Sequence, residues 1–240
     1  MQDIQTIDIA FDMYSDVKPH QDPDLYSKRL KRYHQLLWSK PLPNGKMFSL
    51  ERGGPKFYLK HTSELGEYHL TSDTITHSYR NTKKMSHIPR EIKDSFFTKG
   101  SLIGAYIVFP KRRIKGIMTI NQARGCHYQI GDRFDLTLEC IRRLYKGGDS
   151  PLQKTLLHYQ DFFELFGDFK GYIEFFLLQD LIENDFETIK FYLPFDEFRQ
   201  NSPYPQTIED YCTYRSKTIE FIEMRNARIE QYSLEHLTNV

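Results

Sequence analysis

The chain has 240 residues, of which 39% are apolar and 27% are charged, and it contains 18 Phe and 16 Tyr. A chain of this length can form one hydrophobic core, and its aromatic content excludes a disordered polymer. Its three cysteines, Cys126, Cys140 and Cys212, form no CxxC pair, which argues against a disulfide framework or a zinc knuckle. No apolar run approaches the roughly 20 residues of a membrane span, and the acidic start is unlike a secretory signal. We therefore expect a cytoplasmic protein with no membrane partner.

The net charge of +1 conceals opposite charges in the two parts of the chain. Residues 1–154 carry 26 Lys and Arg against 16 Asp and Glu, whereas residues 155–240 carry 7 against 16. This asymmetry fits a basic face that attracts phosphate-bearing ligands. It fits equally well two layers whose charges complement each other, and the sequence leaves both interpretations open.

The first predicted element is a helix near the start of the chain. Asp22 and Pro23 are typical of a helix start, and apolar residues follow at helical spacing from Leu25 onward. The helix is expected to end before Pro41. Its remaining positions are mostly basic and include His34, which predicts an apolar inner face and a basic outer face.

Short strands are predicted after this helix. Alternating residues between 46 and 70, interrupted by Gly and Pro at 53–55, predict a hairpin or meander. A helix is expected around 89–98. The apolar run 102–109 predicts a central strand covered on both faces, and 117–120 is expected to form its partner strand.

The rest of the chain predicts helices. Asp132 is expected to cap a helix over 132–146, in which Phe134, Leu138 and Ile141 recur on one face. Further helices are expected from Pro151, over 167–181 and over 207–234. Strands followed by helices favour an α+β fold in a single domain, with a small, mostly antiparallel sheet from the N-terminal half packed against a mainly helical C-terminal half. The strand-bearing basic part is residues 1–130 and the helical part is residues 131–240.

The strongest polar cluster follows the expected strand at 117–120. Asn121 and Arg124 lie just beyond it, and Arg133 lies at a predicted helix start. Arginine can hold a phosphate through two parallel hydrogen bonds, and helix N-termini favour anions. We therefore expect these three residues to bind a phosphate-bearing ligand. The alternative is that the arginines pair with carboxylates nearby: Asp132, Asp135 or Glu139.

A second cluster spans residues 72–80. Asp73 and His77 are four residues apart, so on a helix the carboxylate would orient the imidazole for acid–base catalysis, with Ser72 or Ser78 as a hydroxyl group. The alternative is a routine helix cap formed by the Ser-Asp pair.

A third cluster contains Trp38, the only tryptophan, and Lys40. An aromatic ring beside a cation suits the binding of a nucleotide base. The alternative is that Trp38 fills the core at a helix end.

Signatures of several enzyme classes are absent from the sequence. It contains no Walker-type glycine loop, no GxGxxG, no HExxH and no GxSxG motif. The nine histidines show no spacing typical of metal ligands. The sequence therefore indicates no metal site and identifies no cofactor.

The chain resembles an uncharacterised bacterial family that carries a domain of unknown function. The similarity rests on residues 37–43, on residues 72–79, and on Asn121 with 124–125 leading to 132–139. The resemblance implies a bacterial cytosolic protein and brings no assigned activity.

Two functions follow as hypotheses. The first is an enzyme or sensor for a nucleotide or an RNA end, with phosphate on Arg124 and Arg133 and proton transfer by Asp73 and His77. The second is a non-catalytic interaction module, including a homo-oligomer, whose oppositely charged parts mediate assembly. General nucleic-acid binding is disfavoured, because the sequence pI is about 7.7 and no reader motif is present.

Overall fold

The computed structural model describes residues 6–52, 58–77, 86–94, 96–112, 115–199 and 203–237. Within these ranges an antiparallel sheet from the N-terminal half packs against helices that come mainly from the C-terminal half, which confirms the expected α+β class. The helices are α1 (Pro23–Tyr26), α2 (Lys28–Trp38), α3 (Arg90–Asp94), α4 (Phe97–Gly100), α5 (Ile120–Cys126), α6 (Phe134–Lys146), α7 (Gln153–Leu157), α8 (Gln160–Glu164), α9 (Phe169–Phe175) and α10 (Ile208–His236), with 3-10 turns at Ile103–Ala105 and Gln179–Leu181.

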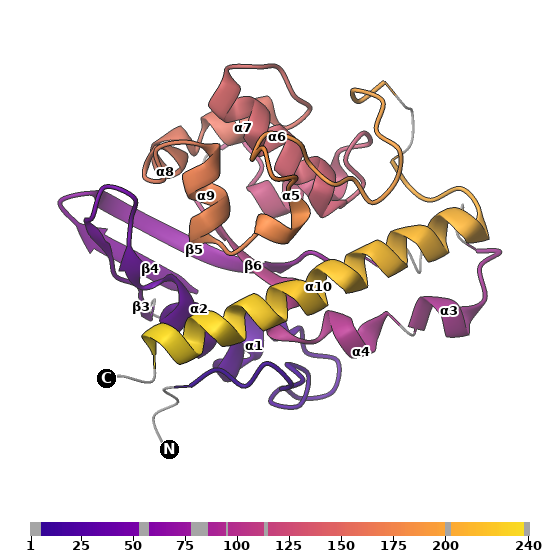
Figure 1. Cartoon of the computed structure of the whole chain (residues 1–240), viewed down its shortest axis with the longest axis horizontal. Coiled ribbons are helices and arrows are strands. Elements are labelled where there is room, and N and C mark those ends of the chain that lie inside the picture. The colour runs from indigo at the N-terminus through magenta and orange to yellow at the C-terminus, as the bar shows by residue number, and fades with distance from the viewer. Residues whose placement is uncertain are drawn as a thin grey trace.

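The strands form two antiparallel sheets, of two and four strands, in the described part of the chain. They are β1 (Lys40–Pro41), β2 (Met47–Phe48), β3 (Glu51–Arg52), β4 (Leu59–Ser63), β5 (Gly66–Thr74) and β6 (Tyr106–Pro110). The small sheet is β1-β2, and the larger one has the order β3-β4-β5-β6. Figure 1 shows α10 running diagonally across the molecule, with α5 to α9 on one side and α1, α3 and α4 on the other.

β6 differs from its predicted position. It stands at the end of the strand order, whereas a central strand was expected, although all five of its residues are buried. The expected partner strand at 117–120 is wrong: Thr119 caps α5, and Ile120 is the first residue of that helix. Helices cover β6, so its residues are buried and apolar like those of a central strand. It nevertheless pairs with only one neighbouring strand, β5.

The first predicted helix is divided in two. Ser27 has an extended backbone and ends α1, and its Oγ accepts a hydrogen bond from Leu30 N at 2.9 Å, which starts α2. Leu25 therefore lies on a separate short helix and is 59% exposed. His34, expected on the basic outer face, is fully buried, with Nδ1 2.9 Å from the hydroxyl of Tyr58.

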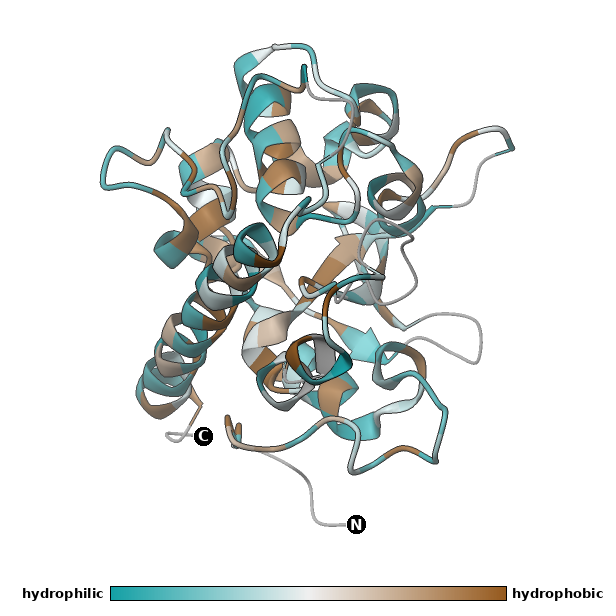
Figure 2. Cartoon of the chain, turned by 90° about the vertical axis from the view of Figure 1, so that its right-hand side faces the viewer, coloured by the Kyte–Doolittle hydropathy of each residue, from teal (hydrophilic) through white to brown (hydrophobic). Residues whose placement is uncertain are grey.

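Aromatic side chains dominate the core. Trp38 has no exposed surface and packs against Phe176 and Phe175, with ring centroids 5.2 and 6.3 Å away. Figure 2 shows a hydrophobic strand near the centre of the molecule, whereas the surrounding helices and loops mix hydrophilic and hydrophobic residues. In the part of the chain that the structure describes, none of the helices combines the length and apolarity that crossing a bilayer requires.

Arg225 of α10 joins the helical layer to the sheet. Its side chain is fully buried and donates to backbone carbonyls on two sides of the helix. Close packing here also requires Gly104, because a Cβ at that position would lie 2.6 Å from the carbonyl of Ile222. The carbonyls that accept from Arg225 belong to Gly104 (3.0 Å), Tyr106 (2.8 Å), Phe176 (3.1 Å) and Leu177 (3.2 Å).

Ion pairs connect the basic first part of the chain with the acidic second part. They support the interpretation in which the two layers complement each other in charge, because part of the asymmetry is neutralised within the chain. These pairs are Lys99–Glu223 (2.7 Å), Arg112–Asp161 (2.8 Å), Lys146–Glu187 (2.6 Å) and Arg143–Glu197.

Candidate functional site

A cavity of about 500 Å³ lies where the end of β5 meets α1 and the start of α4. Three carboxyl groups line it, from Asp22, Asp24 and Asp73, together with the imidazoles of His20 and His77. We call it the acid cavity. Its aromatic lining residues are Tyr14, Phe96 and Tyr106.

Arg124 lies behind the wall of this cavity, and its side chain is fully buried. Its Nη1 donates to Asp73 Oδ2 at 2.6 Å and to the Thr74 carbonyl at 3.0 Å. Its Nη2 donates to the Asp132 carbonyl at 3.1 Å, and its Nε lies 3.4 Å from Asp132 Oδ1. One guanidinium thus joins two carboxylates, and the second of them reaches His77, whose Nδ1 lies 3.0 Å from Asp132 Oδ2.

A short helix and a tight turn bring Arg124 and Asp132 together. Thr119 starts α5 with a reciprocal capping box, which places Arg124 in the last turn of the helix. The chain then reverses through Gly131 and Asp132, at φ 54° and 61°, so that Asp132 N donates to the Arg124 carbonyl at 2.9 Å. A Cβ at Gly131 would lie 2.6 Å from the Pro203 ring, so this turn requires glycine for space as well as for its backbone angle.

Asp24 and Asp73 form a coupled pair of carboxyl groups. Burial, followed by the negative charge of Asp73, raises the pKa of Asp24 to about 8. Burial also raises the pKa of Asp73, against the opposing charge of Arg124. Ser72 Oγ donates to Asp24 Oδ1 at 2.5 Å. Because Arg124 contacts Asp73 directly, it favours the charged form of Asp73, whereas the raised pKa of Asp24 favours its protonated form.

His77 is held through its backbone and its ring. The Tyr214 hydroxyl accepts from His77 N at 3.3 Å and donates to the His77 carbonyl at 3.2 Å. Burial opposes a charge on Asp132, but Arg124 and the hydrogen bond from His77 outweigh it and hold the pKa of Asp132 below its ordinary value. An ionised Asp132 accepts a hydrogen bond from His77 Nδ1, which fixes the orientation of the imidazole at the cavity wall.

Asn121 and Arg124 lie beneath the acid cavity and are not among its lining residues. Asn121 Nδ2 donates to the Ser72 carbonyl at 3.0 Å, so it holds the end of β5 in place. Both residues therefore position the wall that carries Asp73. Direct contact of either residue with a ligand stays a prediction.

Arg133 lies outside the acid cavity, in a buried network of its own. Its Nε and Nη2 donate to the two carboxylate oxygens of Asp135 at 3.1 and 2.5 Å, and its Nη1 donates to the Pro203 carbonyl at 3.1 Å. Asp135 also accepts from Tyr192 N at 2.9 Å. Arg133 is the N-cap residue of α6, which corrects the expectation that Asp132 caps this helix. For Arg133, the alternative interpretation is therefore the correct one: the arginine pairs with a nearby carboxylate, that of Asp135.

Trp38 and Lys40 are also separate from the acid cavity. Trp38 is a fully buried core residue, so its ring has no exposed face on which a nucleotide base could stack. Lys40 is 9% exposed and lines a different cavity. The structure thus brings Asp73 and His77 together, places Asn121 and Arg124 behind them, and leaves the other predicted residues elsewhere.

Residues 7–229 match a family model described as a family of unknown function, DUF6994. The chain belongs to this family. No curated protein and no solved structure matches the chain. Among the residues described for this DUF6994 protein, no three or more His, Cys, Asp or Glu side chains are grouped as a metal site would require.

The helical arrangement considered for Asp73 and His77 does not occur in this DUF6994 chain, because residues 72–77 form no helix. Asp73 lies on β5, opposite Ile107 of β6, and His77 follows three residues after the strand ends. The strand conformation also rules out a helix cap at the Ser-Asp pair. Asp73 and His77 are therefore linked through Arg124 and Asp132, not through a helical turn. Residues 78–80 of the cluster lie outside the described residues.

Two carboxyl groups of the site were missed by sequence reasoning. Asp22 was assigned only as a helix cap, which it is, since its Oδ1 accepts from Asp24 N at 3.0 Å. Asp24 was assigned no role. Its contact with Ser72 spans 48 positions, and no local pattern indicates such a pairing. The one available signal was the presence of two carboxylates beside Pro23 at a helix start.

Proposed function

We propose that the acid cavity binds a small ligand that carries a protonated amine, and that Asp24, Asp73 and His77 exchange protons with it. The supporting observation is the lining: three carboxyl groups, with no lysine or arginine among the described residues that line the cavity. A carboxylate accepts strong, charge-assisted hydrogen bonds from an ammonium group. Tyr14, Phe96 and Tyr106 also line the cavity, and an aromatic ring that presents its face to the ammonium group would add cation–π attraction.

The same groups can transfer protons. A protonated Asp24 is suited to donate, because its pKa is raised to about 8. The carboxylate of Asp73 and the imidazole of His77 are suited to accept the proton that an ammonium group must lose before its nitrogen can react. Two carboxyl groups in different environments thus take the roles of acid and base.

The phosphate-bearing ligand that the sequence favoured stays a prediction. Arg124 and Arg133, its expected binding residues, both donate to carboxylates inside the protein. A phosphate in the acid cavity would face three carboxyl groups. For this reason we prefer an amine.

Thermal denaturation at low ionic strength, with putrescine and ethanolamine as amine probes and inorganic phosphate and AMP as anionic probes, tests the proposal. The key variant is Asp22→Asn, which removes a charge from the lining and keeps a good helix cap. Asp185→Asn is the matched control, because Asp185 also accepts backbone hydrogen bonds but does not line the cavity. An amine at about 100 times its Kd should stabilise the wild type by roughly 2.7 kcal/mol.

We expect the amine-induced shift to shrink in Asp22→Asn and to persist in Asp185→Asn. The proposal fails if neither amine stabilises the protein, or if both variants respond like the wild type. Stabilisation by phosphate or AMP instead would favour the hypothesis derived from the sequence.

A cytoplasmic location is part of this proposal. Cys126, Cys140 and Cys212 are all free thiols, which suits a reducing compartment. The interaction-module hypothesis, including a homo-oligomer, stays a prediction. The ion pairs within the chain already use part of the charge on which that hypothesis depends.

A further inference from the structure

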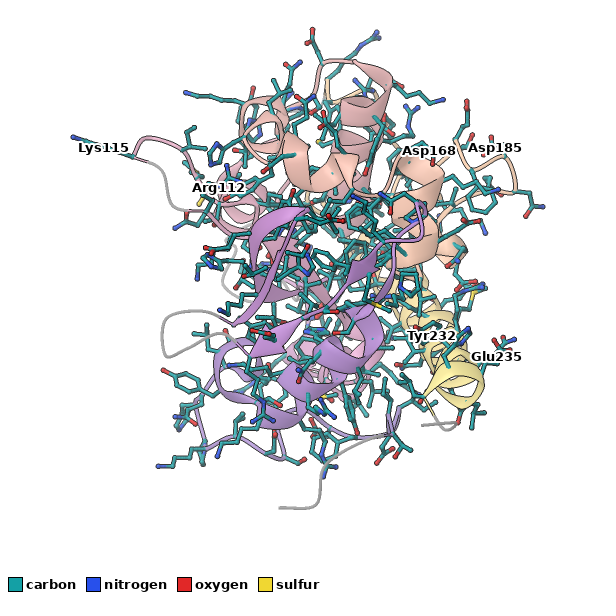
Figure 3. The ribbon with its side chains drawn as sticks, turned by 90° about the vertical axis from the view of Figure 1, so that its left-hand side faces the viewer. Arg112, Lys115, Asp168, Asp185, Tyr232 and Glu235 are labelled. Carbon is teal, nitrogen blue, oxygen red and sulfur yellow. The ribbon has the colours of Figure 1, made fainter. Side chains whose placement is uncertain are left out.

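A second cavity, of about 680 Å³, lies between the β1–β2 hairpin, α9 and the end of α10. We call it the Lys40 cavity. In Figure 3, Asp168 and Tyr232, which belong to its lining, lie on the same flank of the molecule. Its walls are largely apolar or aromatic and include Pro41, Leu42, Pro43, Phe166, Phe175 and Tyr232.

Lys40, a residue that is only 9% exposed, lines this cavity. Its Nζ lies over three aromatic rings, 4.5 Å from the centroid of Tyr232, 4.7 Å from that of Phe175 and 5.2 Å from that of Trp38. No side chain or carbonyl of the described residues gives this nitrogen a hydrogen bond or an ion pair. Among the described residues, only the faces of these rings stabilise the protonated form of the amine.

The backbone around Lys40 is firmly held. Lys40 pairs with Phe48 across the hairpin, and Leu42 N donates to the Lys46 carbonyl at 2.9 Å. Gly45 closes the turn at φ 80°. The amine is therefore presented by a fixed element at the end of α2.

Burial, together with one nearby positive charge, favours a neutral amine. Burial, followed by the positive charge of Arg225, lowers the pKa of Lys40 to about 7. On the α9 side, Asp168 is occupied as a helix cap, accepting from Gly171 N at 2.8 Å. The other titratable groups that line the cavity are Lys170 and Glu174, which lie 3.8 Å apart, and on α10 Tyr232 and His236.

We propose that Lys40 is a nucleophilic amine that forms an imine with a small aldehyde or ketone bound in the Lys40 cavity. The nitrogen lone pair forms a bond to the carbonyl carbon, and the carbonyl π electrons move to oxygen. The nitrogen loses two protons and the oxygen gains two, so the oxygen leaves as water. The products are one imine and one water, with no oxidant or reductant.

The cavity selects this chemistry for two reasons. Only the neutral form of a lysine is nucleophilic, and desolvation beside a second cation is an established way to populate that form near neutral pH. The apolar walls suit a carbonyl compound with an apolar body. This inference uses residues separate from the acid cavity and does not depend on its function.

Reductive trapping of the wild-type protein tests the proposal. The protein is treated with limiting propanal and cyanoborohydride across a pH series, and the modified lysines are identified by peptide mass spectrometry. Lys46, on the same hairpin and about half exposed, is the internal control. At pH 7 we expect Lys40 to be modified at least about tenfold faster than Lys46, because far more of it is neutral. Half of its maximal rate should be reached near pH 7.

Trp38 provides a second readout, because it is the only tryptophan and its ring lies 5.2 Å from Lys40 Nζ. Its fluorescence should change as Lys40 titrates, and Lys40→Met should abolish that change. The titration is repeated in His236→Gln, since this imidazole lines the same cavity. The proposal is overturned if the folded wild type modifies Lys40 no faster than Lys46. A titration of Trp38 that survives in Lys40→Met would count against it as well.

Discussion

Burial shifts the ionisable groups of the two cavities in opposite directions. In the acid cavity it favours the neutral acid and raises the pKa of Asp24 to about 8, whereas in the Lys40 cavity it favours the neutral amine and lowers the pKa of Lys40 to about 7. Asp73 differs from both, because a guanidinium touches its carboxylate at 2.6 Å. A buried group keeps its charge where an opposite charge contacts it, and favours its neutral form where burial and like charges prevail.

The arginines behind the two cavities show the same contrast. Arg124 contacts the carboxylates of Asp73 and Asp132, so its charge is neutralised locally. Arg225 donates to four carbonyls, which satisfy its hydrogen bonds but leave its positive charge to act on Lys40. Four substitutions test this comparison.

The largest effect is expected for Arg225→Met. It leaves four buried carbonyls without their donor, so unfolding free energy should fall by more than about 4 kcal/mol in urea denaturation. Arg228→Met on the same helix is the control, since Arg228 is partly exposed and pairs with Asp180, and its loss should be about 1 kcal/mol. Equal losses for the two variants would contradict the anchoring role of Arg225.

Arg124→Met should destabilise the protein by about 3 kcal/mol at neutral pH, because Asp73 and Asp132 would be left buried without their cation. Adding Asp73→Asn should restore part of the loss, since it removes one uncompensated charge. A double-mutant cycle from urea denaturation measures this coupling. Additive losses would show that the pair does not act as a unit.

Asp24→Asn should change how stability depends on pH. In the wild type the folded pKa is raised to about 8, so the contribution of Asp24 to stability is complete below its unfolded pKa of 3.8 and is lost as the pH rises towards 8. The variant lacks this loss, and its stability relative to the wild type should rise by on the order of 1 to 3 kcal/mol from pH 4 to pH 8. Denaturation curves across this range measure it, with Asp149→Asn as the control for a changed net charge, because Asp149 is exposed and lies outside the acid cavity. A parallel pH dependence would disprove the protonated state of Asp24.

Lys40→Met should show the opposite trend with a smaller effect. The folded pKa of Lys40 is lowered from 10.5 to about 7, so its contribution is complete above 10.5 and is lost as the pH falls towards 7. The variant should therefore be more stable than the wild type by about 1 kcal/mol at pH 7, with a difference that shrinks towards pH 10. Lys46→Met should change stability by less than about 0.5 kcal/mol. If Lys40→Met is destabilised at pH 7, the rings stabilise a charged lysine.

Several elements could be predicted because their signals are local. In α6, Phe134, Leu138 and Ile141 are fully buried, as their helical spacing predicted, and Gly147 ends the helix at φ 71°. The long helix after Thr207 is also confirmed, with a capping box at its start. Such periodicity records which face of a segment is buried, whatever the partner is.

Other elements failed because two local signals compete. The apolar run at 117–120 suits a strand, but Thr119 and Gln122 also form a capping box, and the helix prevailed. At residues 22–38 the apolar spacing continues across Ser27, yet its side chain starts a new helix. Tertiary packing decides between such alternatives.

The sequence by itself determined the α+β class, the aromatic core and the helices with a regular apolar face, because each depends on neighbours within a few residues. It also drew attention to Asp73 and His77, which do meet in one cavity. Only the tertiary structure decided that Arg124 binds Asp73 across 51 positions and that Asp24 meets Ser72 across 48. It also decided which charges Asp24 and Lys40 keep, because a pKa depends on burial and on long-range neighbours that no local pattern records.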